Sequence, residues 1–211
     1  MRTNRLIIAL LACATITLVA CGLDEKEPIE TMTSGFMTAT TDHKGYITTI
    51  KDDFGKTYRI TEKSEVIRPD TTLRVVTSIA IADDGDARIL QLVSPMSFKA
   101  PEDSIISDTL RVRDPLKVSS TYIGGGYLNI VLAIKVKKED TNHMILYTHM
   151  DTPARTAFTI YHNAYGDSEV YTKNAYLSIP LSSYGLHKND TVSISYNSPD
   201  GDREIKLVYN K

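Results

Sequence analysis

Apolar and polar residues alternate along most of the C-terminal half of the chain. The clearest case is residues 127–136 (YLNIVLAIKV), in which every second residue from Leu128 to Val136 is aliphatic. A period of two is typical of a strand with one buried face. Further segments of the same character cover residues 116–122, 143–149, 157–162, 170–181, 191–196 and 204–209. About seven such strands predict an antiparallel, immunoglobulin-like β-sandwich over residues 115–211.

The N-terminal half shows the same period in shorter segments. In residues 73–82 the apolar residues Leu73, Val75, Ile79 and Ile81 alternate with others that include Arg74 and Ser78. Further candidate strands cover residues 36–40, 46–50, 56–60 and 87–93. Asp84-Gly85, between the segments of residues 73–82 and 87–93, is a strong hairpin signal. Five short strands in about 65 residues favour a small OB-like β-barrel over residues 35–99.

Residues 100–114 interrupt the strand pattern. This segment is rich in acids, Ser and Thr, carries Pro101 and is followed by Pro115, which is typical of a linker between domains. After residue 20 no segment has a convincing helical period, and only a short turn near residues 181–184 is expected. The predicted fold class is therefore all-β, with a five-stranded barrel, a linker and a β-sandwich.

The first twenty residues have the pattern of a secretory signal. Arg2 and Arg5 precede an uncharged stretch from Leu6 to Ala20 that is too short to span a bilayer as a helix, which takes roughly twenty residues. Leu18-Val19-Ala20-Cys21 resembles the lipobox of bacterial lipoproteins, in which the cysteine is acylated. The alternative is a plain signal peptide with a chance cysteine.

Acylation of Cys21 predicts a particular location for the mature chain. Residues 1–20 are then a cleaved signal peptide, and residues 21–34 are a lipidated acidic tether that is too polar to fold. The acidic group Asp24-Glu25-Lys26-Glu27, shortly after the cysteine, resembles the surface-export signal of Bacteroidetes lipoproteins, although a solvated spacer explains the same residues. We expect an outer-membrane lipoprotein that is exposed on the cell surface, rather than one that faces the periplasm.

Charge and cysteine content exclude several classes of function. The formal net charge is −2, and the loss of Arg2 and Arg5 with the signal peptide makes it −4. A chain without basic excess is not expected to bind nucleic acid. The two cysteines, Cys13 and Cys21, lie in the signal peptide and at the predicted lipid site. The mature domains therefore hold no disulfide and no thiolate metal site.

Several short motifs of the second half resemble those of one known family. Residues 126–129 (GYLN), 161–163 (YHN) with Gly166-Asp167, and 176–181 (YLSIPL) are similar to the C-terminal domain of NigD-like lipoproteins of Bacteroidetes. The first half resembles the matching OB-like domain through residues 52–55 (DDFG) and 74–76 (RVV). Tyr122 stands where a tryptophan is often found.

The resemblance implies an architecture more than an activity. It implies an OB-like barrel followed by a β-sandwich on a lipid anchor, over essentially the whole mature chain. The family name derives from a bacteriocin gene cluster, which implies an immunity-type role.

Candidate ligands and nucleophiles are interpreted as structural. His143, His149, Asp151 and His162 lack a recognised zinc-site spacing. Asp52-Asp53 and the acids of residues 83–86 fit hairpin turns better than a calcium loop. Residues 124–126 (GGG) precede a strand rather than a helix, so that they fit a turn better than a phosphate cradle. We therefore predict no metal, no cofactor and no catalytic residue.

Tyrosine is the one residue type whose distribution suggests binding. Ten of the twelve tyrosines follow residue 120, and exposed tyrosine is common in binding surfaces. The candidate binding residues are Tyr147, Tyr161, Tyr165, Tyr171 and Tyr184. The alternative is that these tyrosines fill the edges of the sandwich.

The function predicted from sequence is a non-catalytic binding or interaction module of the cell envelope. Its partners are the membrane, through the lipid, and a protein or glycan, with an immunity-type role as one form of this function. A glycan-binding accessory lipoprotein is the first alternative. A hydrolase is the second, although no catalytic constellation supports it.

Overall fold

The computed structural model describes residues 31–63, 66–138, 142–152 and 155–210, and these residues form an all-β fold. The predicted fold class is confirmed: a closed five-stranded barrel is followed by two further sheets. The predicted signal peptide, Cys21 and the tether up to residue 30 lie outside the described residues. Among the described residues, no helix is long and apolar enough to cross a membrane.

The barrel is formed by the first five strands. They are β1 (Thr31–Thr41), β2 (Ile47–Asp52), β3 (Thr57–Ile60), β4 (Thr72–Ile81) and β5 (Asp86–Val93). The strands close in the order β1-β2-β3-β5-β4, with β3 and β5 paired in parallel. Met37, Ile50, Val75 and Ile79 fill the interior. Residues 31–34, which the sequence placed in the tether, belong to β1 because they pair with residues 78–81 of β4.

The second half is a sandwich of two sheets. One sheet has the order β10-β7-β6 and the other β12-β11-β9-β8. The strands are β6 (Lys117–Gly124), β7 (Tyr127–Val136), β8 (Met144–Thr152), β9 (Arg155–Asn163), β10 (Tyr171–Pro180), β11 (Thr191–Ser198) and β12 (Gly201–Val208). Alternate residues of both sheets, such as Leu132 and Phe158, form the core between them. A short 3-10 turn, η3 (Leu181–Ser183), lies where a turn was predicted.

Residues 94–116, here called the strap, connect the two halves and contact the sandwich at several points along their length. Met96 forms a parallel bridge with Leu177 at the edge of β10. Pro101 O accepts the backbone N–H of His149 in β8, and Val112 O accepts that of His162 in β9. Two 3-10 turns, η1 (Asp103–Ile105) and η2 (Asp108–Leu110), lie between these contacts. The segment predicted as a linker, residues 100–114, is thus packed on the four-stranded sheet.

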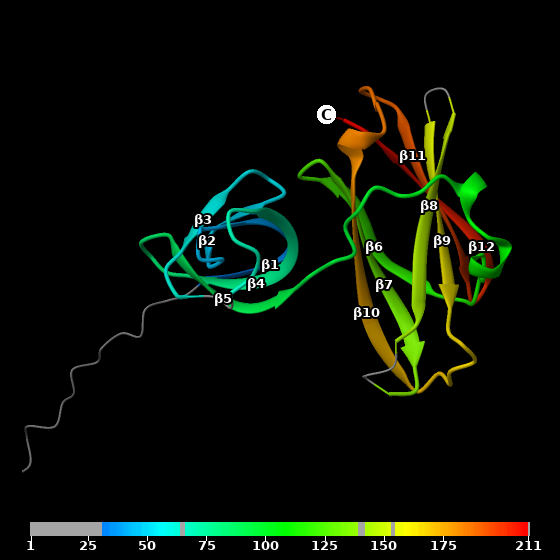
Figure 1. The fold of residues 1–211 in the computed structure, drawn as a ribbon, viewed down its shortest axis with the longest axis horizontal. Coiled ribbons are helices and arrows are strands. Elements are labelled where there is room, and N and C mark those ends of the chain that lie inside the picture. Colours follow the sequence, from blue (N-terminus) through cyan, green and yellow to red (C-terminus); the bar gives the residue numbers. More distant parts are fainter. Residues whose placement is uncertain (1–30, 64–65, 139–141, 153–154, 211) are drawn as a thin grey trace, which may run out of the picture.

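The barrel lies beside the three-stranded sheet, whereas the four-stranded sheet lies on the far side of the sandwich (Figure 1). Phe36 on the outer face of the barrel makes edge-on ring contacts with Tyr122 of β6 and Tyr176 of β10. These contacts leave Phe36 only 4% exposed. The outer face of the three-stranded sheet is therefore covered by the barrel over part of its area, and a buried polar cluster lies there.

Candidate functional site at the domain junction

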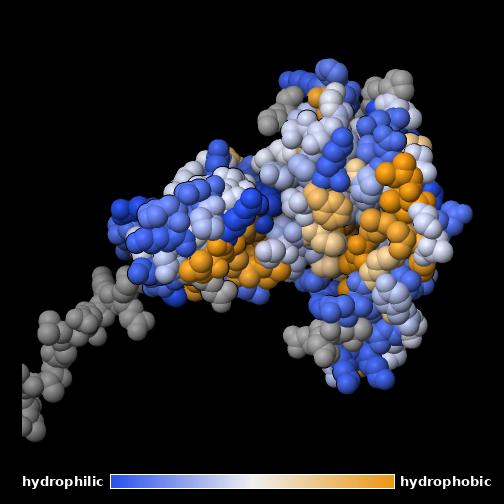
Figure 2. Space-filling model, in the orientation of Figure 1, coloured by the Kyte–Doolittle hydropathy of each residue, from blue (hydrophilic) through white to orange (hydrophobic). Residues whose placement is uncertain are grey.

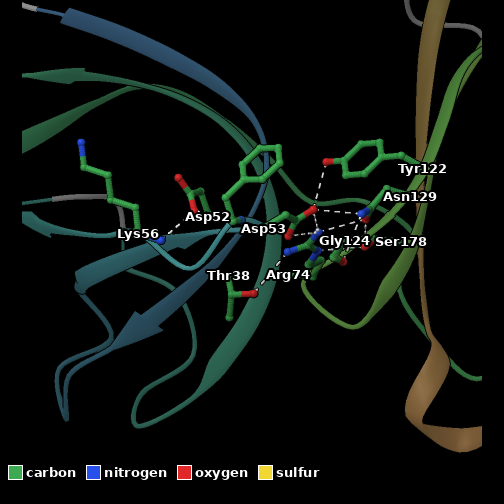
Figure 3. A network of polar contacts seen from close by, with 10 residues as sticks. Thr38, Asp52, Asp53, Lys56, Arg74, Tyr122, Gly124, Asn129 and Ser178 are labelled. Carbon is green, nitrogen blue, oxygen red and sulfur yellow. Dashed lines mark hydrogen bonds and ion pairs between the residues drawn. The ribbon is translucent and has the colours of Figure 1, made fainter. Parts of the chain in front are cut away.

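Arg74 is the centre of a buried polar cluster between barrel and sandwich (Figure 3). It lies on the outer face of β4, because its neighbour Val75 points into the barrel. Its Nε donates to Ser178 Oγ at 2.9 Å, and its Nη2 donates to Asn129 Oδ1 at 2.9 Å. Its Nη1 donates to Thr38 Oγ1 at 3.2 Å, within the barrel. Arg74 therefore contacts β1 of its own domain and both β7 and β10 of the other.

Asp53 provides the negative charge of the cluster. It lies in the β2–β3 turn, and its Oδ2 accepts hydrogen bonds from Arg74 Nη2 at 2.7 Å and from Tyr122 Oη and Asn129 Nδ2 at 2.9 Å each. Burial, and then the nearby Asp53 charge, raises the pKa of Tyr122. The phenol therefore stays protonated and serves as a donor. Two residues of the sandwich thus bind a carboxylate of the barrel.

Aromatic rings complete the surroundings of Arg74. Its guanidinium carbon lies 4.5 Å from the ring centroid of Tyr127 and 5.8 Å from that of Phe36. A cation over an aromatic face is stabilised by the ring quadrupole, and more so when water is excluded. Arg74 thus lies close to one aromatic ring from each domain.

The glycines of the β6–β7 hairpin allow Asp53 to approach. Gly125 and Gly126 both have positive φ, as a tight hairpin turn requires. A Cβ atom on Gly125 would overlap with Asp53 Oδ1, and one on Gly124 would lie 3.0 Å from Asp53 Oδ2. The sequence interpretation of residues 124–126 as a turn is confirmed, and the absence of side chains also makes room for the docked carboxylate.

Two clefts flank the cluster where the domains meet. One, of about 700 Å³, is lined by Lys51 and Asp52 of the barrel and by Tyr127 and Tyr209 of the sandwich. The other, of about 550 Å³, is more apolar and is lined by residues that include Val76, Val93, Val131 and Tyr176. Figure 2 shows hydrophobic surface on the barrel beside this junction. Phe54, which is 95% exposed, lines both clefts.

Three of the five tyrosines predicted to form a binding surface are buried, so the prediction was wrong for them. Tyr147, Tyr161 and Tyr184 are 0%, 5% and 8% exposed. Tyr147 and Tyr184 belong to the core between the two sheets, whereas Tyr161 lies on the outer face of β9 and contacts Asp103 of the strap. A strand pattern does not show which of its tyrosines face the core, and it cannot reveal a segment that packs over a sheet from elsewhere in the chain. These tyrosines are part of the fold rather than of a surface.

Each buried tyrosine holds the strap by its hydroxyl group. Tyr147 Oη donates to Phe98 O at 2.8 Å and accepts a hydrogen bond from the Phe98 N–H at 3.0 Å. The rings of the two residues are stacked, with their centroids 4.5 Å apart. Tyr184 Oη accepts the Ala100 N–H at 2.8 Å. Tyr161 Oη donates to Asp103 Oδ1 at 2.8 Å. The strap and these tyrosines thus satisfy each other's polar groups.

Asp103 is the main side-chain anchor of the strap. Its Oδ1 also accepts Thr148 Oγ1 at 2.7 Å, and its Oδ2 lies 2.8 Å from Arg111 Nη1. Burial opposes ionisation of this carboxyl, but the hydrogen bonds from Thr148 and Tyr161 and the charge of Arg111 together lower its pKa. The strap is therefore fixed by a charged group that is satisfied on both oxygens.

The other two predicted tyrosines are exposed. Tyr165 and Tyr171, both in or next to the β9–β10 connection, are 69% and 60% exposed. Tyr165 lies in this connection and Tyr171 is the first residue of β10, so neither makes the strap contacts of the three buried tyrosines. For these two, exposure agrees with the prediction, and their role in binding stays a prediction.

The histidines and turn acids have structural environments. His143 Nδ1 and His162 Nε2 lie 2.9 Å apart, and His143 Nε2 lies 3.2 Å from Asp167 Oδ2. Asp52 Oδ1 accepts the backbone N–H of Phe54 and of Lys56, as expected of an acid in a hairpin turn. Among the described residues, no group of three or more His, Cys, Asp or Glu could hold a metal ion.

The cluster around Arg74 was not predicted from the sequence, although both of its key residues lie in motifs that the sequence offers. Asp53 was interpreted as a turn acid and Arg74 as a polar residue of an alternating strand. The available signal was the resemblance in residues 52–55 and 74–76, which selects the same two positions. Fold and junction together define a two-domain, all-β protein whose barrel is docked on a sandwich through a buried arginine and aspartate.

Comparison with known proteins agrees with this architecture. Residues 98–209, more than half of the chain, match the NigD-like C-terminal beta sandwich domain. The chain belongs to the NigD-like family, as its sequence motifs predicted. The matched region begins within the strap, in keeping with the packing of the strap on the sandwich. A search of curated proteins finds no match.

Solved structures extend the similarity to both domains. A NigD-like immunity protein from Bacteroides caccae ATCC 43185 is 25% identical, with a TM-score of 0.69, over 87% of this chain and 99% of that one. A protein from Parabacteroides distasonis ATCC 8503, described as toxin related, is 21% identical, with a TM-score of 0.68, over 85% of this chain and 94% of that one. A candidate lipoprotein from Bacteroides fragilis NCTC 9343 is 12% identical, with a TM-score of 0.57, over 85% and 96%. The latter two share the fold.

Proposed function

We propose that this protein is a non-catalytic interaction module of the cell envelope that is held to the outer membrane by a lipid on Cys21 and binds another protein. The observation that carries the proposal is the junction. Its charged groups, Arg74 and Asp53, are paired with each other and with residues of the sandwich, and both side chains are almost fully buried. Groups shielded in this way hold two domains together and cannot meet a substrate.

The comparisons support a protein partner of the immunity type. The similar structure from Bacteroides caccae is described as an immunity protein, and the one from Parabacteroides distasonis as toxin related. An immunity protein acts by binding, so a rigid two-domain surface suits it. The lipid anchor is supported by Leu18-Val19-Ala20-Cys21 and by the lipoprotein description of the similar Bacteroides fragilis structure. We favour display at the cell surface because acidic residues follow Cys21.

Two measurements on the full chain test the proposal. Cell fractionation should find the natural protein in the outer membrane and the Cys21→Ser variant in the soluble fraction. Chemical crosslinking on intact cells, followed by mass spectrometry, should join the natural protein to one defined protein. A Cys21→Ser variant that stays in the membrane contradicts the anchor, and the absence of any protein adduct contradicts the protein partner.

A glycan ligand is the second candidate, and one observation favours it. The larger junction cleft combines Tyr127 and Tyr209 with the charged residues Lys51 and Asp52. Aromatic and polar groups in one cleft suit a sugar, which offers both apolar faces and hydroxyl groups. A glycan array probed with the full chain tests this. Binding that disappears in a Lys51→Ala, Asp52→Asn double variant would assign the cleft to a glycan.

A further inference from the structure

Tyr165 has a backbone conformation that its side chain does not favour. Tyr165 and Gly166 have φ of +52° and +70°, and the Asp167 N–H donates to Ala164 O at 2.9 Å. A turn with two left-handed central residues is of type I′, in which Asn-Gly and Asp-Gly are the preferred pairs. A tyrosine at the first central position therefore costs free energy that asparagine would not.

The surrounding structure holds this turn firmly in place. Ala164 N–H donates to Asp114 Oδ2 of the strap at 2.7 Å, and Tyr165 N–H donates to Asn163 Oδ1 at 2.8 Å. Asp167 Oδ2 accepts the backbone N–H of Lys137 at 2.8 Å and faces His143. Strain of this kind persists only where neighbouring contacts determine the conformation, and it clusters at functional positions.

The Tyr165 side chain is mostly exposed and makes no polar or ring contact with the described part of the fold. The residue is 69% exposed, and its ring and hydroxyl group make no hydrogen bond or ring contact with any residue that the structure describes. Val170 and Tyr171, at the end of the same connection, are 58% and 60% exposed. An exposed apolar group on a rigid turn costs little entropy to immobilise, which favours a binding role.

The position of the turn indicates the kind of partner. Figure 1 shows the β9–β10 connection at the end of the sandwich opposite the C-terminus, away from the barrel. An exposed turn at the end of the sandwich fits a concave surface of a partner, whereas a sugar is usually bound in a concave site of the protein itself. The aliphatic Val170 beside two tyrosines also favours a protein, because aromatic and aliphatic anchors in partner pockets dominate protein interfaces.

We propose that Tyr165, supported by Val170 and Tyr171, is the contact tip for a protein partner. The partner offers an apolar pocket for the Tyr165 ring and a hydrogen-bond acceptor for its hydroxyl group. This inference rests on the proposed function in one respect, namely that the partner is a protein. It adds where that protein binds.

The first test needs no partner. Tyr165→Asn gives the turn its preferred Asn-Gly pair, so the urea midpoint of the full chain should rise. Tyr165→Phe keeps the ring and should leave the midpoint unchanged. A midpoint that stays the same or falls in Tyr165→Asn would show that Tyr165 is not strained, and the inference would lose its basis.

The second test locates the contact. The photo-crosslinking residue p-benzoyl-phenylalanine is placed at position 165, and at position 54 as a matched exposed aromatic site, in cells that make the protein naturally. The adduct is identified by mass spectrometry, and the identified protein is purified and titrated against the natural chain and its variants. We expect a protein adduct from position 165. We also expect Tyr165→Asn to raise the dissociation constant by at least about thirtyfold, which is the lower bound for an interface hot spot.

The remaining outcomes separate the inference from the proposed function. A protein adduct from position 54 alone, or binding that is unchanged by Tyr165→Asn but lost in Phe54→Asn, would move the contact to the junction. The inference then fails while the proposed function stands. A polysaccharide adduct, or none from either position, contradicts both.

Discussion

Arg74 Nη2 lies 2.7 Å from each carboxylate oxygen of Asp53, and these two side chains are only 2% and 3% exposed. Both residues belong to the barrel, yet the sandwich buries them. Docking of the domains therefore removes an ion pair from water, which is costly. Hydrogen bonds from Tyr122 and Asn129 to Asp53, and from Arg74 to Ser178, offset that cost. The pair is thus specific for one arrangement of the two domains.

Asp53→Asn should destabilise the protein strongly, because it leaves Arg74 buried without a counter-charge. A loss of about 3 kcal/mol in the free energy of unfolding is typical of a broken buried pair. The matched control is Asp86→Asn, since its partner Arg59 has a side chain that is 73% exposed. The control should lose less than about 1 kcal/mol. Equal, small losses in urea unfolding would mean that the domains separate and let water reach Arg74.

Gly125→Ala should disturb domain docking beyond the strain of its backbone. The new Cβ atom would overlap with Asp53 Oδ1, at a φ of +61°. Gly185 has nearly the same φ, +59°, and a Cβ atom there would meet nothing within 4 Å, so that Gly185→Ala measures the backbone strain alone. We expect about 1 kcal/mol for Gly185→Ala and a clearly larger loss for Gly125→Ala. Equal losses in thermal or urea unfolding would show that Asp53 moves freely.

The strap should be required for a stable sandwich. Ala100 is 1% exposed within the sandwich core, and Asp103 satisfies Thr148 and Tyr161. We propose that a fragment of residues 95–211 folds by itself, whereas one of residues 115–211 is much less stable. Circular dichroism with urea titration compares the two. Equal stability would restore the interpretation of residues 100–114 as a linker.

Stability should fall as the pH decreases from 7.5 to 5. Burial lowers the pKa of His162, and nearby His143 adds to this effect. The Asp114 carbonyl, the Pro115 backbone and the Asp114 carboxylate oppose it without reversing it. The unfolded chain therefore takes up a proton near pH 6.5 that the folded chain resists, so stability is greatest above this pH and declines below it. Asp103 and Asp167 have lowered pKa values, so their contribution to stability is present throughout this pH range and is lost only at more acidic pH.

The pH effect is checked by the free energy of unfolding at several pH values. His162→Gln should flatten the dependence between pH 7.5 and 5. His187→Gln is the control, since the His187 side chain is 88% exposed, and it should leave the slope unchanged. If the free energy of unfolding of His162→Gln still changes with pH as in the natural protein, the pH dependence arises from another group.

The sequence determined the strands and the fold class. In residues 127–136 the alternation gave the bounds of β7 without error, because every second side chain of this strand must enter the core. Asp84-Gly85 marked the β4–β5 hairpin for a local reason, the positive φ of Gly85. Strand period and turn chemistry are properties of neighbouring residues, and one sequence is enough to detect them.

The tertiary structure alone decided what covers the outer faces. A period of two shows that Arg74 and Tyr161 point away from the core of their own sheets, but not that a second domain covers one and the strap the other. The hydrogen bond from Arg74 to Ser178 joins residues 104 positions apart. No local pattern encodes that separation. The junction forms because the two folded domains bring complementary charges, hydroxyl groups and glycines to the same place.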